Sequence, residues 1–510
     1  MKTRILIYCL IFVLAASACS QATPPAIAQE PRPAAQYELP APAAPPAPSL
    51  PRAQPTTSVA GNTYQDYGVN PRTDTRFDNL STFALDVDTA SYAVARRYIR
   101  DGSLPPIEAV RVEEFINAFD QGYAAPNSAA FTIYADGAPS PFGVDGSYYL
   151  RFGVQSYRLP EELRKPLVLT FVIDTSGSMK EQNRLELVKA ALQLLVERLS
   201  WRDSIAVIAY NTDAQVILEP ISGEQQRQIL GAIERLTPAG STNAEAGLRL
   251  GYRYAQSAYQ PGASNRVILC SDGVANTGET DVNNLLDMVG GYVAEGIDLT
   301  TIGVGMGNFN DVLLEQLADR GNGNYDYIDT MEEARSLFVE KLTSTLQVVA
   351  YDAKVQVDFN PDTVLEYRQV GYENRSLSDQ AFRDDRVDGG EVGAGHTATA
   401  LYEVRLAPGA QGRIATVQLR WQDAETRQVR EINGNLNTWD LYPSFQASDP
   451  HYQLSVSVAA YGEVLRASPY IHTSLNEISR MAQQVARSLP GDEQVQEFAV
   501  LARQAALIAR

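Results

Sequence analysis

The middle of the chain alternates between short apolar runs and longer segments with apolar residues at helical spacing. Residues 167–173 (LVLTFVI) are continuously apolar and rich in β-branched side chains, which is typical of a buried strand. Further strands are expected over 204–210, 214–218, 266–270, 298–303 and 325–328, and helices over 184–199, 224–236, 243–258, 281–295, 310–319 and 331–346. Strands that alternate with helices predict an α/β fold, a mostly parallel sheet with helices on both faces.

The segments on either side of this α/β region are richer in alternating apolar and polar positions. Such alternation predicts half-buried strands, at 131–135, 147–155, 353–359, 364–370, 398–406 and 413–422. We interpret these strands as a β-sandwich that flanks the α/β region or receives it as an insertion. A strand at 82–88 and helices at 90–100 and 108–118 are expected before them, and helices at 453–466, 474–488 and 491–508 after them.

The N-terminus has the pattern of a targeting segment. Lys2 and Arg4 precede an apolar run, residues 5–18, that is shorter than the ~20 residues of a spanning helix, so a signal peptide is expected. Small residues then precede Cys19, as in a bacterial lipobox, which predicts that Cys19 is lipidated. An ordinary cleavage site with an incidental Cys is the alternative. Residues 21–60 contain eleven prolines and predict an extended spacer.

These patterns divide the chain into six parts. The expected boundaries are a signal peptide at 1–18, the anchor Cys with a Pro/Ala-rich linker at 19–75, an N-terminal α/β flanking segment at 76–125, a β-rich domain formed by 126–160 with 350–450, the main α/β domain at 165–347 and a helical region at 451–510.

Composition excludes several classes of function. The 510 residues carry a formal net charge of −19, which disfavours binding to nucleic acid. Three Cys are too few for a disulfide-stabilised scaffold. Three His in 510 residues disfavour a zinc enzyme with several histidine ligands.

Oxygen-bearing side chains follow the central strands of the expected sheet. Asp174, Ser176 and Ser178 come directly after the first strand, Thr242 lies between two helices, and Asp272 follows the strand at 266–270. Ligand sites of such sheets lie at the carboxyl ends of the strands. Hard oxygen donors without sulfur or imidazole predict a site for Mg²⁺, Mn²⁺ or Ca²⁺.

The set D-x-S-x-S, Thr and Asp resembles the metal-ion-dependent adhesion site (MIDAS) of a von Willebrand factor type A domain, over about residues 165–347. The resemblance implies that Ser176 and Ser178 ligate the ion directly, that Thr242 does so when a ligand is bound, and that Asp174 and Asp272 act largely through water. An Asp or Glu of a partner protein would then complete the coordination. The resemblance therefore implies adhesion through protein–protein interaction, and no enzyme activity.

The flanks extend the resemblance. Residues 82–123 (TFALDVDTASY…VRVEEFINAFDQGY) resemble the N-terminal segment of bacterial type A lipoproteins, and the stretch that begins YDAKVQVDFNP resembles their C-terminal domain of uncharacterised function. With Cys19, this implies a lipid-anchored, extracytoplasmic protein of the cell envelope.

Enzyme motifs are incomplete in this sequence. No G-x-S-x-G occurs, and Gly303-Val304-Gly305-Met306-Gly307 lacks the spacing of a phosphate-binding loop and is expected to be a turn. Asp86 and Asp88 resemble the D-x-D-x-T nucleophile motif of haloacid-dehalogenase-type phosphatases, so a phosphohydrolase is an alternative. The two residues also fit a second carboxylate loop, or a strand end at which Asp88 caps the helix at 90–100. A type A scaffold without a metal-dependent ligand is a further alternative.

Overall fold

The computed structural model describes residues 57–59, 62–85, 87–127, 129–142, 146–273, 282–305, 310–340 and 346–509. The expected signal peptide, Cys19, most of the linker and Asp86 lie outside these residues. Among the helices of the described residues, none is both long and apolar enough to cross a bilayer.

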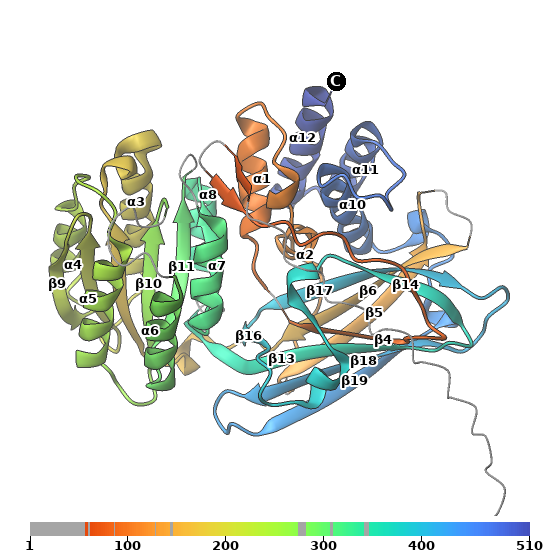
Figure 1. Ribbon diagram of the computed structural model, residues 1–510, viewed down its shortest axis with the longest axis horizontal. Coiled ribbons are helices and arrows are strands. Elements are labelled where there is room, and N and C mark those ends of the chain that lie inside the picture. The colour runs from red at the N-terminus through yellow and green to blue at the C-terminus, as the bar shows by residue number, and fades with distance from the viewer. Residues whose placement is uncertain are drawn as a thin grey trace, which may run out of the picture. The chain divides into compact units, whose positions relative to one another are not determined.

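The central part of the chain forms a six-stranded sheet with the order β12-β11-β10-β7-β8-β9 (Figure 1). Neighbouring strands are parallel except β9, which runs antiparallel to β8. The predicted α/β fold is therefore confirmed. The strands are β7 (Leu167–Asp174), β8 (Ser204–Tyr210), β9 (Ala214–Ser222), β10 (Ser264–Ser271), β11 (Asp298–Val304) and β12 (Tyr325–Ile328).

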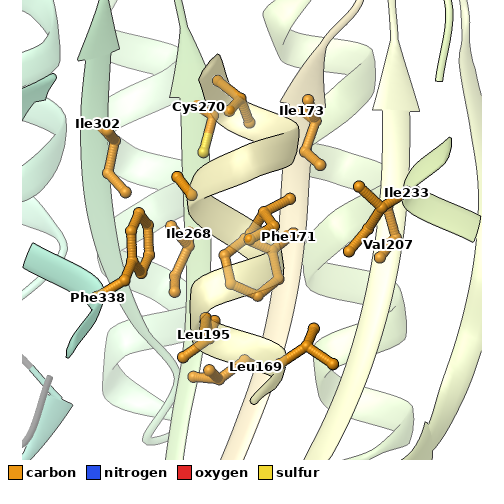
Figure 2. Packing of buried hydrophobic residues seen from close by; sticks show 14 of the residues in the cluster. Leu169, Phe171, Ile173, Leu195, Val207, Ile233, Ile268, Cys270, Ile302 and Phe338 are labelled. Carbon is orange, nitrogen blue, oxygen red and sulfur yellow. The ribbon is translucent and has the colours of Figure 1, made fainter. Parts of the chain in front are cut away.

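Helices cover both faces of this sheet because the side chains of each central strand alternate between two cores. Phe171 of β7 points to the face where Leu195 and Phe338 pack (Figure 2). Val172 points to the opposite face and packs in a cluster with Leu248. The helices are α3 (Arg184–Val196), α4 (Gln226–Glu234), α5 (Ala244–Ser257), α6 (Val282–Ala294), α7 (Asp311–Arg320) and α8 (Met331–Arg335), which continues as a π-helical turn (Ser336–Glu340).

Two antiparallel sheets form the β-rich part of the chain. One has the order β15-β4-β13-β18-β19, with β16 also paired to β13, and the other has the order β3-β14-β17-β6-β5. The strands are β3 (Thr73–Asp74), β4 (Leu80–Ala84), β5 (Phe131–Pro139), β6 (Ser147–Ser156), β13 (Val348–Phe359), β14 (Val364–Val370), β15 (Ser376–Leu377), β16 (Gly390–Gly393), β17 (Thr397–Leu406), β18 (Arg413–Asp423) and β19 (Val429–Asn437).

Strands from both sides of the α/β region pair with each other. Phe152 of β6 lies opposite Ala400 of β17, and Phe83 of β4 lies opposite Val355 of β13. Residues of both sheets share one hydrophobic core. The α/β region is thus placed, in sequence, between strands that belong to the same sheets.

Strand β19 was not predicted from the sequence. Its residues, VREINGNLN, are mostly polar and exposed, and β18 is its partner in the sheet. An edge strand of this kind lacks the apolar alternation by which half-buried strands are recognised.

The helices outside the α/β region pack together. They are α1 (Ala90–Arg100), α2 (Val112–Asn117), α10 (Pro450–Leu465), α11 (Leu475–Ser488) and α12 (Glu493–Ile508), and their apolar faces share one cluster. The C-terminal helices are therefore as expected. The helix expected over 108–118 is instead a 3-10 turn (Ile107–Ala109) followed by α2, because Arg111 between them has an extended backbone, with φ −104° and ψ 109°.

The remaining short elements connect these layers. A small antiparallel hairpin, β1 (Thr57–Val59) with β2 (Asn62–Tyr64), precedes β3, and Tyr64 packs in the core cluster that contains Leu314 of α7. Other 3-10 segments cover Glu161–Leu163, Gly177–Asn183, Glu373–Arg375, Asp379–Arg383, Thr438–Asp440 and Phe445–Ala447.

Candidate functional site

The predicted site residues lie at the carboxyl edge of the central sheet. Strands β7 and β10 are parallel neighbours with Ile173 opposite Cys270, so the residues that follow each strand emerge side by side. Asp174 and Asp272 therefore belong to adjacent strand ends. The sheet topology alone accounts for their proximity.

Asp174 is a buried carboxylate at the end of β7. Its Oδ1 accepts a hydrogen bond from the backbone N–H of Ser176 at 2.8 Å, and its Oδ2 accepts from the hydroxyls of Ser271 at 3.0 Å and Tyr210 at 3.3 Å. Burial and the nearby charge of Asp272 raise the pKa of Asp174 to about 6, although the bonds from Ser176 and Ser271 oppose this shift. A buried carboxylate next to a second one is a place where a cation is electrostatically favoured.

Three of the predicted residues form one chain of side-chain contacts. The hydroxyls of Ser176 and Ser178 are 3.0 Å apart, and the Ser178 hydroxyl donates to Oδ1 of Asp272 at 3.0 Å. Ser176 is buried, and Ser178 is half-buried. Neutral hydroxyl oxygens and a carboxylate oxygen thus converge at the edge of the sheet.

The loop that carries Thr242 is bonded to the loop of the two serines. The N–H of Gly177 donates to the carbonyl of Gly240 at 3.0 Å, and the N–H of Ala239 donates to the carbonyl of Thr175 at 2.7 Å. Gly240 has a φ of +79°, and a Cβ there would lie 2.7 Å from Oγ1 of Thr212, so the turn requires glycine. Thr242 follows this turn and is buried.

Sequence reasoning missed Arg184, the first residue of α3. Its Nη1 lies 2.6 Å from Oδ2 of Asp272 and donates to the carbonyl of Ser178 at 3.3 Å. The sequence held one signal: a cation in the first turn of a helix opposes the helix dipole. This placement marks Arg184 as unusual but does not identify its partner, which only the tertiary structure shows.

Gly305, which follows β11, leaves the space that Arg184 occupies. A Cβ at position 305 would lie 2.2 Å from Nε of Arg184, and the φ of Gly305 is +77°. Within the glycine-rich segment that lacks phosphate-loop spacing, Gly305 therefore makes room for the Arg184 side chain beside the site.

Asp88, part of the alternative phosphatase motif, is engaged in structural contacts. Its Oδ1 accepts from the backbone N–H of Tyr325 at 3.1 Å, and its Oδ2 accepts from Nη2 of Arg375 at 3.4 Å. Asp88 thereby links the segment before α1 to β12 and to the β-rich part. Asp86 lies outside the described residues.

The donor set fits a hard divalent cation. Within the described part of the chain, no group of three or more His, Cys, Asp or Glu side chains is placed to hold a metal ion. The hydroxyls of Ser176, Ser178 and Thr242 and the carboxylates of Asp174 and Asp272 are oxygen donors of the kind that suits Mg²⁺, Mn²⁺ or Ca²⁺.

Family models match three stretches of the chain. A model described as von Willebrand factor type A domain matches residues 169–275, one described as von Willebrand factor matches residues 58–147, and one described as uncharacterized protein YfbK, C-terminal, matches residues 344–412. The central sheet and its edge loops are thus a von Willebrand factor type A domain, as predicted.

Similar proteins extend the match over most of the chain. The uncharacterized protein YfbK of Escherichia coli (strain K12) is 37% identical over 446 residues, which span 82% of this chain and 77% of that protein. The chain therefore belongs to the YfbK family of proteins with a von Willebrand factor type A domain.

Two further matches are more distant. The uncharacterized protein sll0103 of Synechocystis sp. (strain ATCC 27184 / PCC 6803 / Kazusa) is 29% identical over 341 residues, 64% of this chain and 77% of that protein. Among solved structures, a von Willebrand factor type A protein from Catenulispora acidiphila has a TM-score of 0.42 and 18% identity and covers 72% of this chain and 88% of its own.

Proposed function

We propose that this chain is a lipid-anchored protein of the cell envelope that binds a protein partner through a divalent cation at the edge of its type A domain. The observation that carries the proposal is the chain of contacts from Ser176 through Ser178 to Asp272, each 3.0 Å long, in front of the buried Asp174. Thr242 completes the set from the loop bonded to Gly177.

The site residues have two different proposed roles in cation binding. Ser176 and Ser178 offer neutral oxygen lone pairs, while Asp174 and Asp272 supply the negative charge that favours a cation. The bound cation supplies an electrophilic centre for an incoming oxygen ligand. The ligand proposed to complete the coordination is an Asp or Glu side chain of the partner. Mg²⁺ is the proposed ion, and Mn²⁺ and Ca²⁺ use the same donor types.

The proposed location rests on the N-terminal sequence. Lipidation of Cys19 and the proline-rich spacer after it would hold the type A domain at a distance from an extracytoplasmic membrane surface. The net charge of −19 supports a protein partner over nucleic acid.

Calorimetric titration of the purified protein with Mg²⁺, Mn²⁺ and Ca²⁺ tests the metal site. The expected result is binding to the wild type that is lost in Asp174→Ala and Ser176→Ala. Ser257→Ala, an exposed serine on α5, is the matched control and should bind as the wild type does. Equal binding by the wild type and a folded Asp174→Ala variant would contradict the proposed site.

A further inference from the structure

The charge balance of the candidate metal site includes Arg184 as well as the five predicted residues. We infer that Arg184 makes cation binding at this site dependent on a carboxylate from outside, an inference that rests on the proposed function. The guanidinium neutralises Asp272, so the site holds a divalent cation weakly alone and firmly only when a partner carboxylate joins it.

The contact between Arg184 and Asp272 is built into the fold. Nη1 of Arg184 and Oδ2 of Asp272 are 2.6 Å apart, and both side chains are nearly inaccessible, with 3% and 2% of their surfaces exposed. The guanidinium is held from two more sides, because it donates to the carbonyl of Ser178 and packs against Gly305. A buried pair that is fixed in this way is not displaced easily by solvent or salt.

Glu181 is a second acidic residue close to Arg184, but its interaction with the guanidinium is weaker than that of Asp272. Glu181 Oε2 lies 3.5 Å from Nη2 of Arg184, but the Glu181 side chain is 69% exposed. Water therefore screens that pair, and the buried charge of Arg184 acts chiefly on Asp272 and on the space in front of Ser178.

The charges of the site then determine what it binds. Asp174 and Asp272, together with Arg184, carry one net negative charge when both carboxyls are ionised. A divalent cation leaves the site with one net positive charge, and one carboxylate from a partner restores neutrality. Without the guanidinium, the two carboxylates alone would neutralise the cation, and the demand for an external anion would fall.

Geometry also links Arg184 to the serine that is proposed to bind the ion. The Ser178 hydroxyl donates to Oδ1 of Asp272 while Arg184 holds Oδ2 and the Ser178 carbonyl. Arg184 thus positions both Asp272 and the turn at Ser178. It is a positioning residue that sets the preference of the site for an anionic ligand.

Calorimetric titration of the full-length protein with Mn²⁺, in chloride and in acetate at equal ionic strength and equal free Mn²⁺, tests this inference. In the wild type, acetate should increase the affinity for Mn²⁺ severalfold. Arg184→Gln should bind Mn²⁺ at least roughly tenfold more tightly in chloride, since a nearby positive charge is removed, and should lose most of the effect of acetate. Arg184→Lys retains the charge and should keep the effect of acetate.

Arg198→Gln is the matched control, because it removes the same charge at an exposed position just beyond the C-terminal end of α3 and should behave as the wild type does. The melting temperature gives a second measurement: Arg184→Gln should melt lower than the wild type without metal and gain more from added Mn²⁺.

Three results would overturn the inference. A folded Arg184→Gln variant with unchanged or weaker Mn²⁺ binding, or with the full effect of acetate, would exclude the role of Arg184 while leaving the metal site intact. The absence of any effect of acetate on the wild type would by itself exclude the inferred dependence on an external carboxylate. The absence of Mn²⁺ binding in every protein, including the wild type in acetate, would instead refute the proposed metal site itself.

Discussion

The guanidinium of Arg111 lies 2.6 Å from a carboxylate oxygen of Asp311, and both side chains are buried. Arg111 precedes α2, whereas Asp311 is the first residue of α7 in the type A domain. The same guanidinium contacts Glu114 and lies 3.6 Å from Glu315. Although burial opposes the charge, these carboxylates hold the pKa of Arg111 well above its ordinary value. One buried cation thus joins the flanking helices to the type A domain.

Replacing Arg111 with Met should lower the free energy of unfolding by about 3–5 kcal/mol, because three buried carboxylates lose their common partner. Urea unfolding followed by circular dichroism measures this change. The control is Arg76→Met, an exposed arginine paired with the half-buried Asp74, which should leave the unfolding midpoint nearly unchanged. Similar midpoints for the two variants would show that the Arg111 cluster contributes little to stability.

The buried ion pair of Asp203 with Arg164 predicts how the stability of the fold depends on pH. Burial disfavours its charge, but two bonds from Arg164, at 2.8 and 2.9 Å, and the N–H groups of Leu167 and Ser200 outweigh burial and lower the pKa of Asp203. The folded state therefore holds the proton less tightly than the unfolded chain does. This stabilisation is complete above the ordinary pKa of 3.8 and is lost as the pH falls through the lower folded value.

Asp203→Asn should consequently cost about 3 kcal/mol or more at neutral pH, and the difference from the wild type should shrink below pH ~4. Urea midpoints measured at several pH values between 7 and 3 give the comparison. Asp213→Asn, an exposed aspartate in the neighbouring β8–β9 turn, should show no such trend. A difference that stays constant over the whole pH range would contradict the assigned role of the Asp203 charge.

Gly240→Ala should both destabilise the fold and weaken metal binding. The left-handed backbone costs any other residue about 1–2 kcal/mol, and here the added methyl would also press on Thr212 at 2.7 Å. Gly262→Ala is the matched control, since its φ is +81° and open space surrounds it. Thermal melting should show a loss for both variants, whereas Mn²⁺ titration should be altered in Gly240→Ala alone. Unaltered Mn²⁺ binding in Gly240→Ala would show that the loop carrying Thr242 does not contribute to metal binding.

Cys19→Ser should release the protein from the membrane fraction of a cell that processes lipoproteins. In the proposed lipidation the thioether to the lipid would form at Cys19, so serine would remove the attachment point while the apolar segment before it is unchanged. Fractionation followed by mass spectrometry of the N-terminus measures the outcome. Cys9→Ser, within the apolar segment itself, should leave the protein in the membrane. Retention of Cys19→Ser with an uncleaved N-terminus would point instead to anchoring by the signal segment.

The central sheet was predictable chiefly because its middle strands, β7, β8 and β10, are largely apolar and almost fully buried. Residues 167–173 bury side chains on both faces of a parallel sheet, and no polar position interrupts their pattern except Thr170, which is itself buried. The grouping of Asp174 with Asp272 was also predictable, since parallel neighbours must end at the same edge. Motif spacing and strand order carry this information in the sequence itself.

The contacts of Arg184 and Arg111 were beyond the reach of such patterns. Arg184 meets Asp272 on a separate strand end, and Arg111 meets Asp311 in another domain. Each pair depends on tertiary packing, and a charged residue in isolation has the same local pattern whether it is solvated or buried. The same limit applies to Asp88. Its local motif resembled that of a phosphatase, whereas its contacts in the fold are with Tyr325 and Arg375.

The pairing of β6 with β17 has a consequence for how this chain acquires its structure. Phe152 is made long before Ala400, its neighbour in the sheet. During synthesis, β4 and β6 therefore precede their partners β13 and β17 by the whole length of the type A domain. Once that domain folds, Lys165 and Gln347 at its two ends are held together, with the Lys165 N–H 2.9 Å from Oε1 of Gln347. The folded domain thus replaces a long flexible loop by a short connection. The loss of conformational entropy on pairing the strands before the domain with those after it is therefore smaller. The type A domain in this sense also brings together the two parts of the chain that form the β-rich sheets.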